Sequence, residues 1–252
     1  MPFTCKNLYG LIGKPLGHSF SADFFNRKFE SEGIDARYLN FEIDSVAELP
    51  RLLVEYPALS GLNVTSPYKR AVIPYLDSVD PTAKEVGAVN VIKIVRMPDG
   101  TPRMEGYNSD VPGFADSLKG MAPGCKNALI LGTGGAATAC RAGFDRLGIR
   151  SVLVSRTPGP ERITYGDITP EIMSSHLIVV NATPLGMYPH VGEAPELPYD
   201  LLTERHLAYD LVYNPDVTEF MRRAAANGAE TKNGLEMLLL QAFESWRIFK
   251  AR

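Results

Sequence analysis

The chain has 252 residues, of which 22% are charged, and it carries a formal net charge of -3 at pH 7. This length is sufficient for two modest domains, each with a hydrophobic core of its own. The charge excludes the basic footprint that is typical of nucleic-acid-binding proteins. The first 16 residues contain neither an apolar segment of membrane-spanning length nor the pattern of a cleaved secretory signal. We therefore expect small-molecule ligands and no nucleic-acid or membrane partner.

Cysteine and histidine are used sparsely. The three cysteines, Cys5, Cys125 and Cys140, are scattered and form no C-x-x-C pair. This pattern favours reduced thiols in a cytoplasmic protein over a disulfide scaffold. Because the histidines show no ligand spacing with cysteines or carboxylates, we expect no metal site and a structural or solvated role for each of them. They are His18, His176, His190 and His206.

Short apolar, β-branched segments alternate with stretches of helical periodicity along the chain. This alternation predicts an α/β fold with mainly parallel sheets. Phe24, Phe25 and Phe29 share one face of an expected helix, as do Phe220 and Ala224 in a later one, and both sets are expected in the core. The expected strands are residues 8–12, 38–43, 62–65, 89–95, 128–131, 152–154, 177–180 and 207–212.

Two serines follow the first expected strand. Ser19 and Ser21 stand two residues apart, after a strand and a proline, and their hydroxyls could hold a carboxylate. Ser21 could equally be the N-cap of the helix that contains Phe24. The residues alone leave both interpretations open.

Residues 61–69 form a candidate catalytic segment, read as a short strand that Pro67 stops and a helix that follows. Strand periodicity puts Asn63 and Thr65 on the same side, towards the carboxyl end of the strand. Lys69 falls in the first turn of the helix, where its charge opposes the macrodipole. A broken local rule of this kind is typical of functional sites, although a lone lysine is ordinarily a surface residue.

Asp110 lies in a turn-rich segment, residues 106–113, that ends another strand. Its carboxylate could pair with Lys69 across a crevice, or it could cap the helix that follows. The turn-forming residues 122–124 come before the strand at 128–131. We therefore expect a joint between two α/β units within residues 110–124.

Residues 127–137, NALILGTGGAA, form a strand that runs into a turn with G-x-G-x-x-A spacing, and a helix and a second strand follow. Gly132 permits the tight turn, Gly134 lets the backbone approach a pyrophosphate, and Ala137 permits close helix packing. The helix N-terminus offers free N–H groups to phosphates. A nucleotide-free turn is the alternative, but the strand, turn, helix and strand together favour a dinucleotide site.

The second strand of this unit ends in Ser155, Arg156 and Thr157. NAD enzymes usually carry an acidic residue here, about 20 residues beyond the first glycine, to bind the ribose. A guanidinium suits the 2′-phosphate of NADP instead. Alternatively, Arg156 is a solvated charge at the end of a strand. Further along, Gln241 lies on a final amphipathic helix, two turns beyond Gly234 on the same side.

Seven segments, in order and over nearly the whole chain, resemble the shikimate dehydrogenase family. They are residues 10–21, 63–69, 87–90, 108–110, 132–136, 181–187 and 233–237. Three positions depart from the family pattern: Ala22 stands where proline is usual, Ser109 where threonine is common, and Ser155 where asparagine is usual. The last of these bears on contacts to the adenine side of the cofactor.

The resemblance implies the NADPH-dependent, reversible reduction of 3-dehydroshikimate to shikimate, in the shikimate pathway of chorismate and aromatic amino-acid biosynthesis. It implies a substrate-binding α/β domain of residues 1–110, completed by 235–252, and a Rossmann-type NADP-binding domain of residues 111–234. The family's shikimate-binding positions match Ser19, Ser21, Thr65, Asn90, Asp110, Tyr213 and Gln241, with Asn63 expected in the same pocket. Its cofactor-binding positions match Gly132, Thr133, Gly134, Gly135, Ala136, Ser155, Arg156, Thr157, Thr183, Leu211 and Gly234.

Lys69 matches the family's catalytic lysine. Hydride addition to a carbonyl carbon needs a proton donor at the oxygen, so Lys69 would supply the proton and Asp110 would orient it. One alternative is a quinate/shikimate dehydrogenase that prefers NAD, against which Arg156 argues. Another is a catalytically silent NADP-binding sensor, against which Lys69 and Asp110 argue together. Monomer and homodimer both remain open.

Overall fold

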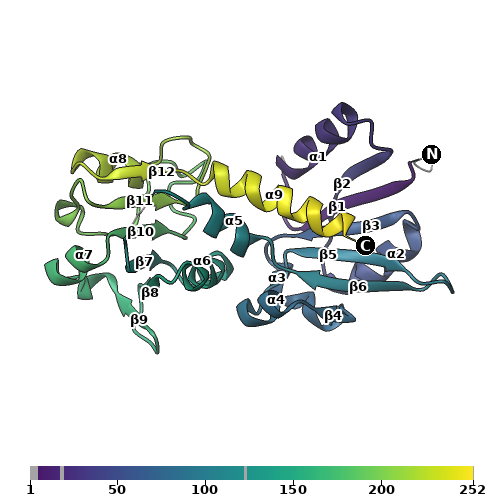
Figure 1. The fold of residues 1–252 in the computed structure, drawn as a ribbon, viewed down its shortest axis with the longest axis horizontal. Helices are drawn as coiled ribbons and strands as arrows, with labels where there is room; N and C mark the ends of the chain where they lie inside the picture. Colours follow the sequence, from purple (N-terminus) through teal and green to yellow (C-terminus); the bar gives the residue numbers. More distant parts are fainter. Residues whose placement is uncertain (1–4, 18–19, 122–123, 252) are drawn as a thin grey trace. The chain divides into compact units, whose positions relative to one another are not determined.

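The computed structural model describes residues 5–17, 20–121 and 124–251. The chain divides into two compact units, of which one consists of Met1–Ser109 with Ala242–Arg252 and the other of Asp110–Gln241. The first unit is therefore discontinuous in sequence (Figure 1). We expected the chain to return to the first unit at residue 235; the structure has this change later, inside the last helix, α9 (Leu235–Lys250).

The first unit contains a six-stranded mixed sheet with the strand order β2-β1-β3-β5-β6-β4 (Figure 1). β1 is parallel to β2 and β3, and β4 is parallel to β6, whereas β5 is antiparallel to both of its neighbours. The prediction of mainly parallel pairing is confirmed, and the antiparallel pairs are those that β5 forms with β3 and β6. The strands are β1 (Asn7–Gly13), β2 (Ala36–Glu42), β3 (Leu59–Val64), β4 (Ser78–Val79), β5 (Val91–Arg96) and β6 (Pro102–Tyr107).

Alternating side chains build a separate core on each face of this sheet. Leu8 and Leu62 belong to the core that α2, α3 and α4 help to form, and Tyr9 and Tyr38 belong to the core formed with α1 and the end of α9. Phe25 and Phe29 are buried in the latter core, as their helical spacing predicts. The helices are α1 (Phe20–Ser31), α2 (Leu49–Glu55), α3 (Tyr68–Ala71) and α4 (Pro81–Val86), with short 3-10 turns at Val46–Glu48 and Ile73–Tyr75.

The second unit has a six-stranded, entirely parallel sheet with the order β12-β11-β10-β7-β8-β9. The chain runs from β7 outward through β8 to β9 and then returns to place β10 on the other side of β7. This reversal is the topological switch point at which open α/β sheets bind their ligands. The strands are β7 (Asn127–Leu131), β8 (Arg150–Ser155), β9 (Arg162–Thr164), β10 (Ile178–Asn181), β11 (Leu207–Asp210) and β12 (Glu230–Lys232).

Helices pack on both faces of the second sheet. One core includes Phe220 and Ala224 of α8, as predicted, and the other includes Phe114 of α5 and Phe144 of α6. No helix separates β8 from β9, because Pro158, Gly159 and Pro160 turn the chain directly into the next strand. The helices are α5 (Asp110–Ser117), α6 (Gly135–Arg146), α7 (Pro170–Ser175) and α8 (Glu219–Ala226), with 3-10 turns at Tyr165–Asp167 and Tyr199–Leu201.

Candidate functional site

The predicted substrate-binding residues of the first unit that the structure describes gather at one end of the strands of its sheet. β1, β2 and β3 end there, β5 begins there, and β6 ends there. Asn63 therefore stands near the end of β3, Asn90 directly before β5, and Ser109 just beyond β6. Ser21 lies in the first turn of α1, which follows β1. The topology brings together polar residues that are far apart in sequence.

Of the two serines that are predicted to hold a carboxylate, the structure describes only Ser21. Ser19 lies outside the described residues, so its position stays a prediction. α1 begins at Phe20, which puts Ser21 inside the helix. The alternative that Ser21 is the N-cap of this helix is therefore wrong. Ser21 is half-buried, and its hydroxyl forms a hydrogen bond with the side chain of Tyr38.

Asn63 is 7% exposed, and its side-chain amide forms hydrogen bonds with other groups of the protein. Its Oδ1 accepts a hydrogen bond from the Tyr38 hydroxyl at 2.9 Å. Its Nδ2 donates to Ser245 Oγ at 2.9 Å and to the carbonyl oxygen of Asn90 at 3.3 Å. Both amide hydrogens thus have partners within the chain. Sequence reasoning found Asn63 but neither Tyr38 nor Ser245.

Asn90 is held by a reciprocal pair of hydrogen bonds with Ser109. Asn90 Nδ2 donates to Ser109 Oγ at 2.9 Å, and Asn90 Oδ1 accepts from the Ser109 backbone N–H at 2.7 Å. The pair fixes which end of the amide is the oxygen. Among residues 5–17, 20–121 and 124–251, the second amide hydrogen of Asn90 has no partner. It can therefore be donated to a ligand.

Thr65 and Lys69 flank the turn that follows β3. A Cβ at Gly13 would lie within 2.6 Å of Leu16 and would also overlap Thr65, so glycine leaves the room that the threonine side chain occupies. Lys69 is in the first turn of α3, as predicted, and its side chain is half-buried. Its carbonyl oxygen accepts from the Val89 N–H at 2.8 Å, which ties α3 to the segment before β5.

Three other predicted substrate residues belong to the second unit. Asp110 is the first residue of α5, where a negative charge is favourable to the helix dipole. Gln241 Nε2 donates to the Leu238 carbonyl oxygen at 2.9 Å, and its backbone packs so closely on Gly113 that a Cβ there would lie 2.9 Å from the Gln241 side chain. Tyr213 is 40% exposed. The predicted pairing of Asp110 with Lys69 of the first unit stays a prediction.

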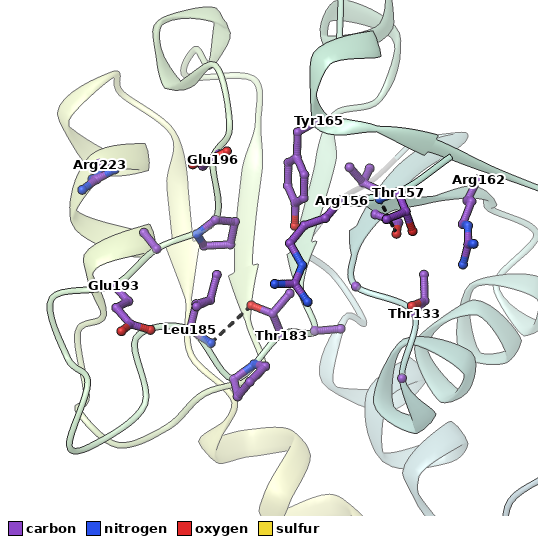
Figure 2. Close-up of a pocket in the computed structure, with 18 of the residues that line it drawn as sticks. Thr133, Arg156, Thr157, Arg162, Tyr165, Thr183, Leu185, Glu193, Glu196 and Arg223 are labelled. Carbon is purple, nitrogen blue, oxygen red and sulfur yellow. Dashed lines mark hydrogen bonds between the residues drawn. The ribbon is translucent and has the colours of Figure 1, made fainter. Parts of the chain in front are cut away.

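A cavity of about 1150 Å³ opens at the carboxyl ends of β7, β8 and β10 (Figure 2). Seven of the eleven predicted cofactor-binding residues line it: Gly132, Thr133, Gly134, Ser155, Arg156, Thr157 and Thr183. The cavity lies at the switch point of the sheet, where a dinucleotide is expected. The other four predicted residues, Gly135, Ala136, Leu211 and Gly234, are not among its lining residues.

The glycine loop has the geometry that its spacing predicts. Gly132 has a φ of +113°, a conformation that other residues rarely adopt, and its N–H donates to the Val154 carbonyl oxygen at 2.8 Å. A Cβ at Gly134 would meet no atom within 4 Å, so the loop presents bare backbone to the cavity. Gly134 is also the N-cap of α6, and Ala137, in the first turn of that helix, is fully buried. Free N–H groups at the start of α6 can therefore bind phosphate.

Positive charge is concentrated at the tip of β8. Arg156 and Arg162 both line the cavity, and Figure 2 shows the Tyr165 ring beside the Arg156 side chain. Burial raises the pKa of Tyr165, and the charge of Arg156 opposes the rise. Arg162 Nη2 donates to the Pro158 carbonyl oxygen at 3.3 Å, whereas its buried Nε has no partner among the described residues. The positive charge of Arg162, which lines the cavity, is suited to an anion.

Arg162 and Tyr165 were not found from the sequence. The available signal was the Pro158, Gly159, Pro160 turn, which returns the chain to the cavity within six residues of Arg156. Gly159 and Arg162 form an isolated β-bridge, so the turn is tight, and the absence of a side chain at Gly159 leaves space for the guanidinium.

Thr183 is fixed by a buried amide at the end of β10. Asn181 Oδ1 accepts from the Thr183 N–H at 3.0 Å and from the Thr183 hydroxyl at 2.6 Å, and Asn181 Nδ2 donates to Asp210 Oδ1 at 3.0 Å. Asp210 also accepts from the hydroxyl of Thr218 at 2.6 Å. Burial raises the pKa of Asp210, and these hydrogen bonds oppose the rise. Leu211 follows directly and closely approaches Gly234, where a Cβ would overlap the Leu211 carbonyl group.

The part of the chain that the structure describes has neither a cluster of metal-ligating side chains nor a helix that could span a membrane. No group of three or more histidine, cysteine, aspartate or glutamate side chains is arranged there to hold a metal ion. None of its helices has the length and apolar character required to span a membrane. His206 is structural: its Nδ1 accepts from the Thr203 N–H at 3.0 Å, and its Nε2 lies 3.1 Å from the Met173 carbonyl oxygen.

A parallel sheet with a glycine loop and a cavity at its switch point, joined to a second α/β unit, defines a two-domain nucleotide-binding protein of the dehydrogenase class. Residues 11–92 match the family profile described as the shikimate dehydrogenase substrate binding domain. The shikimate dehydrogenase (NADP(+)) of Desulforamulus reducens is 35% identical over 268 residues, covering 96% of this chain and 90% of the relative. The chain belongs to the shikimate dehydrogenase family.

Solved structures agree over nearly the full length. A shikimate 5-dehydrogenase from Thermus thermophilus, in complex with NADP(H) and shikimate, is 32% identical with a TM-score of 0.83, covering 97% of this chain and 93% of that one. A quinate dehydrogenase from Corynebacterium glutamicum, in complex with NAD, is 28% identical with a TM-score of 0.85, covering 97% and 94%. Fold similarity alone therefore does not separate these two activities.

Proposed function

We propose that this chain is an NADP-dependent shikimate dehydrogenase, which reduces 3-dehydroshikimate to shikimate reversibly. The observation that carries the cofactor assignment is Arg156 at the tip of β8, in the cavity beside the glycine loop. An NAD enzyme would carry a carboxylate there to bind the ribose hydroxyl, whereas a guanidinium binds the 2′-phosphate of NADP. Arg162, in the same cavity, adds a second positive charge.

The glycine loop at residues 132–136 and the segment at 155–157 would hold NADPH, which supplies the hydride. Lys69 then donates a proton to the carbonyl oxygen as negative charge develops on it, and the ammonium group becomes a neutral amine. In the oxidative direction the neutral amine accepts the proton from the hydroxyl. Asp110 orients Lys69, and Asn90 donates its available amide hydrogen to a ring hydroxyl.

The remaining substrate contacts follow from the polarity of shikimate. Ser19 and Ser21 bind the carboxylate, and Thr65, Tyr213 and Gln241 complete the set around the ring hydroxyls. Holding the ring at several points places the reacting carbon for hydride transfer. One chain carries all of these groups, and both a monomer and a homodimer are compatible with the proposal. The three unpaired cysteines support a cytoplasmic location.

A quinate dehydrogenase is the second candidate, because the structural similarity to the quinate enzyme is as high as that to the shikimate enzymes. Initial rates of reduced-cofactor formation should be measured with shikimate and with quinate, each with NADP and with NAD. We expect the highest kcat/KM for shikimate with NADP. Faster turnover of quinate with NAD would select the second candidate, and absence of turnover with cofactor still bound would select a silent sensor.

A further inference from the structure

Asn63 occupies a register position that has an apolar residue on each of the two adjoining strands. Its neighbours on the adjoining strands are Leu11 of β1 and Val91 of β5. Tyr9 and Phe249 belong to the core on the same face. Burying an amide among such residues is unfavourable unless its hydrogen bonds are made, and an apolar side chain would satisfy packing alone. The amide therefore has a purpose other than packing.

Two residues from distant elements supply the hydrogen bonds. Tyr38 of β2 is 1% exposed and donates its hydroxyl hydrogen to Asn63 Oδ1, and Ser245 of α9 is fully buried and accepts from Asn63 Nδ2. The remaining amide hydrogen goes to the Asn90 carbonyl oxygen, which also accepts from the Val64 N–H at 2.9 Å. The orientation of the Asn63 amide is thus fully determined by three groups of the protein: the hydroxyls of Tyr38 and Ser245 and the carbonyl oxygen of Asn90.

The hydroxyls of Tyr38 and Ser245 also connect to two predicted substrate-binding residues, Ser21 and Asn90, without passing through Asn63. Tyr38 also forms a hydrogen bond with Ser21, and Ser245 Oγ lies 3.0 Å from Ser109 Oγ, which accepts from Asn90 Nδ2 at 2.9 Å. Ser21 and Asn90 are therefore the two ends of a connected hydrogen-bond network, with Tyr38, Asn63, Ser245 and Ser109 between them. Every link runs through side chains that are buried, except at Ser21, which is half-buried.

We propose that Tyr38 and Ser245 are positioning residues of the substrate site, which hold Ser21 and Asn90 in place through the hydrogen-bond network that is centred on Asn63. Asn63 serves as the centre of this network and makes no direct contact with the substrate through its amide hydrogens. The inference rests on the proposed function, because it assumes that Ser21 and Asn90 contact shikimate. It separates the residues of the polar edge into those that bind the ligand and those that orient the binders.

Tyr38→Phe and Ser245→Ala each remove one hydroxyl and leave part of the Asn63 amide unsatisfied. We expect either change to raise KM for shikimate about tenfold, with KM for NADP unchanged and kcat within about threefold, since neither residue touches the reacting atoms. Because both belong to one hydrogen-bond network and share Asn63 as a partner, the double variant should show well under the hundredfold product of the two effects. The shikimate-induced rise in melting temperature should fall in parallel.

Tyr209→Phe is the matched control. It also removes a buried tyrosine hydroxyl, which lies 2.8 Å from Ser117 Oγ in the second unit and is not part of the network around Asn63. It should lower the melting temperature to a similar extent and leave KM for shikimate unchanged. If Tyr38→Phe behaves in the same way as this control, or raises both KM values equally, the positioning role is overturned. If the unaltered protein neither binds nor oxidises shikimate, the proposed function itself fails, and this inference fails with it.

Discussion

Replacing Arg156 and Arg162 by alanine, singly and together, tests the cofactor assignment residue by residue. Arg156 is exposed, so solvent screens its contact with a phosphate. We expect the low end of the range for a charge-assisted hydrogen bond, about 1.5 kcal/mol, which is roughly a tenfold loss in kcat/KM for NADP. Arg162 is partly buried, so solvent screens its contact less. There we expect the upper end, about 3 kcal/mol, or roughly 150-fold.

The assay is kcat/KM for NADP and for NAD in each variant, together with competitive inhibition by 2′,5′-ADP, which reports the phosphate subsite without turnover. NAD lacks the phosphate, so its kcat/KM should change little, and the double variant should use the two cofactors about equally. Arg150→Ala is the control, because this exposed arginine stands at the opposite end of β8. Equal losses for both cofactors, or a preference for NAD in the unaltered protein, would refute the assignment of these arginines to the phosphate.

Lys69→Ala should lower kcat about 100-fold or more while KM for shikimate stays within a few fold, and a raised KM with normal kcat would make Lys69 a binding residue only. Gly234→Ala should destabilise the fold by about 2 kcal/mol or more and raise KM for NADP, because the added Cβ would overlap the Leu211 carbonyl group. Gly166→Ala is the control for both measurements, because a Cβ there would meet nothing nearer than 3.8 Å. We expect the melting temperature of Asp210→Asn, relative to that of the unaltered protein, to rise as the pH increases from 3.8. Burial raises the pKa of Asp210, so the stability that the protonated acid contributes at low pH is lost as the buried acid ionises. A difference in melting temperature that does not change with pH would contradict this.

The sequence predicts the parts of the fold that local physics determines. Each of the eight expected strands corresponds to a strand of the structure, since apolar β-branched runs mark buried parallel strands. Four further strands, β4, β6, β9 and β12, have two to six residues, and their side chains are mostly polar or partly exposed. Of these, only β6 is indicated by the sequence, through the turn-rich segment that ends it. All four lie at or next to the edges of the sheets, where pairing with a neighbour rather than hydrophobic pattern defines the strand.

In the candidate site, too, features formed by neighbouring residues can be predicted from the sequence, and contacts between distant residues cannot. The glycine loop is predictable because Gly132, Gly134 and Ala137 act through backbone geometry within six residues. The partners of Asn63 are not, because Tyr38 lies 25 positions away and Ser245 lies 182 positions away. A pattern at the strand end indicates that an amide is present, but only the packed structure indicates whether its hydrogens are already used.

Both units apply one physical solution at the sheet edge that carries the site. Asn63 in β3 and Asn181 in β10 are buried amides near the carboxyl ends of parallel strands, and each donates both of its hydrogens within the chain. In the first unit this arrangement holds Asn90, and in the second it holds Thr183. A ligand-binding side chain fixed before the ligand arrives loses less conformational entropy on binding, so a satisfied buried amide behind it favours affinity. Substitutions that remove one hydrogen bond from either amide should therefore lower the affinity for the ligand of that unit alone, which is shikimate in the first unit and NADP in the second.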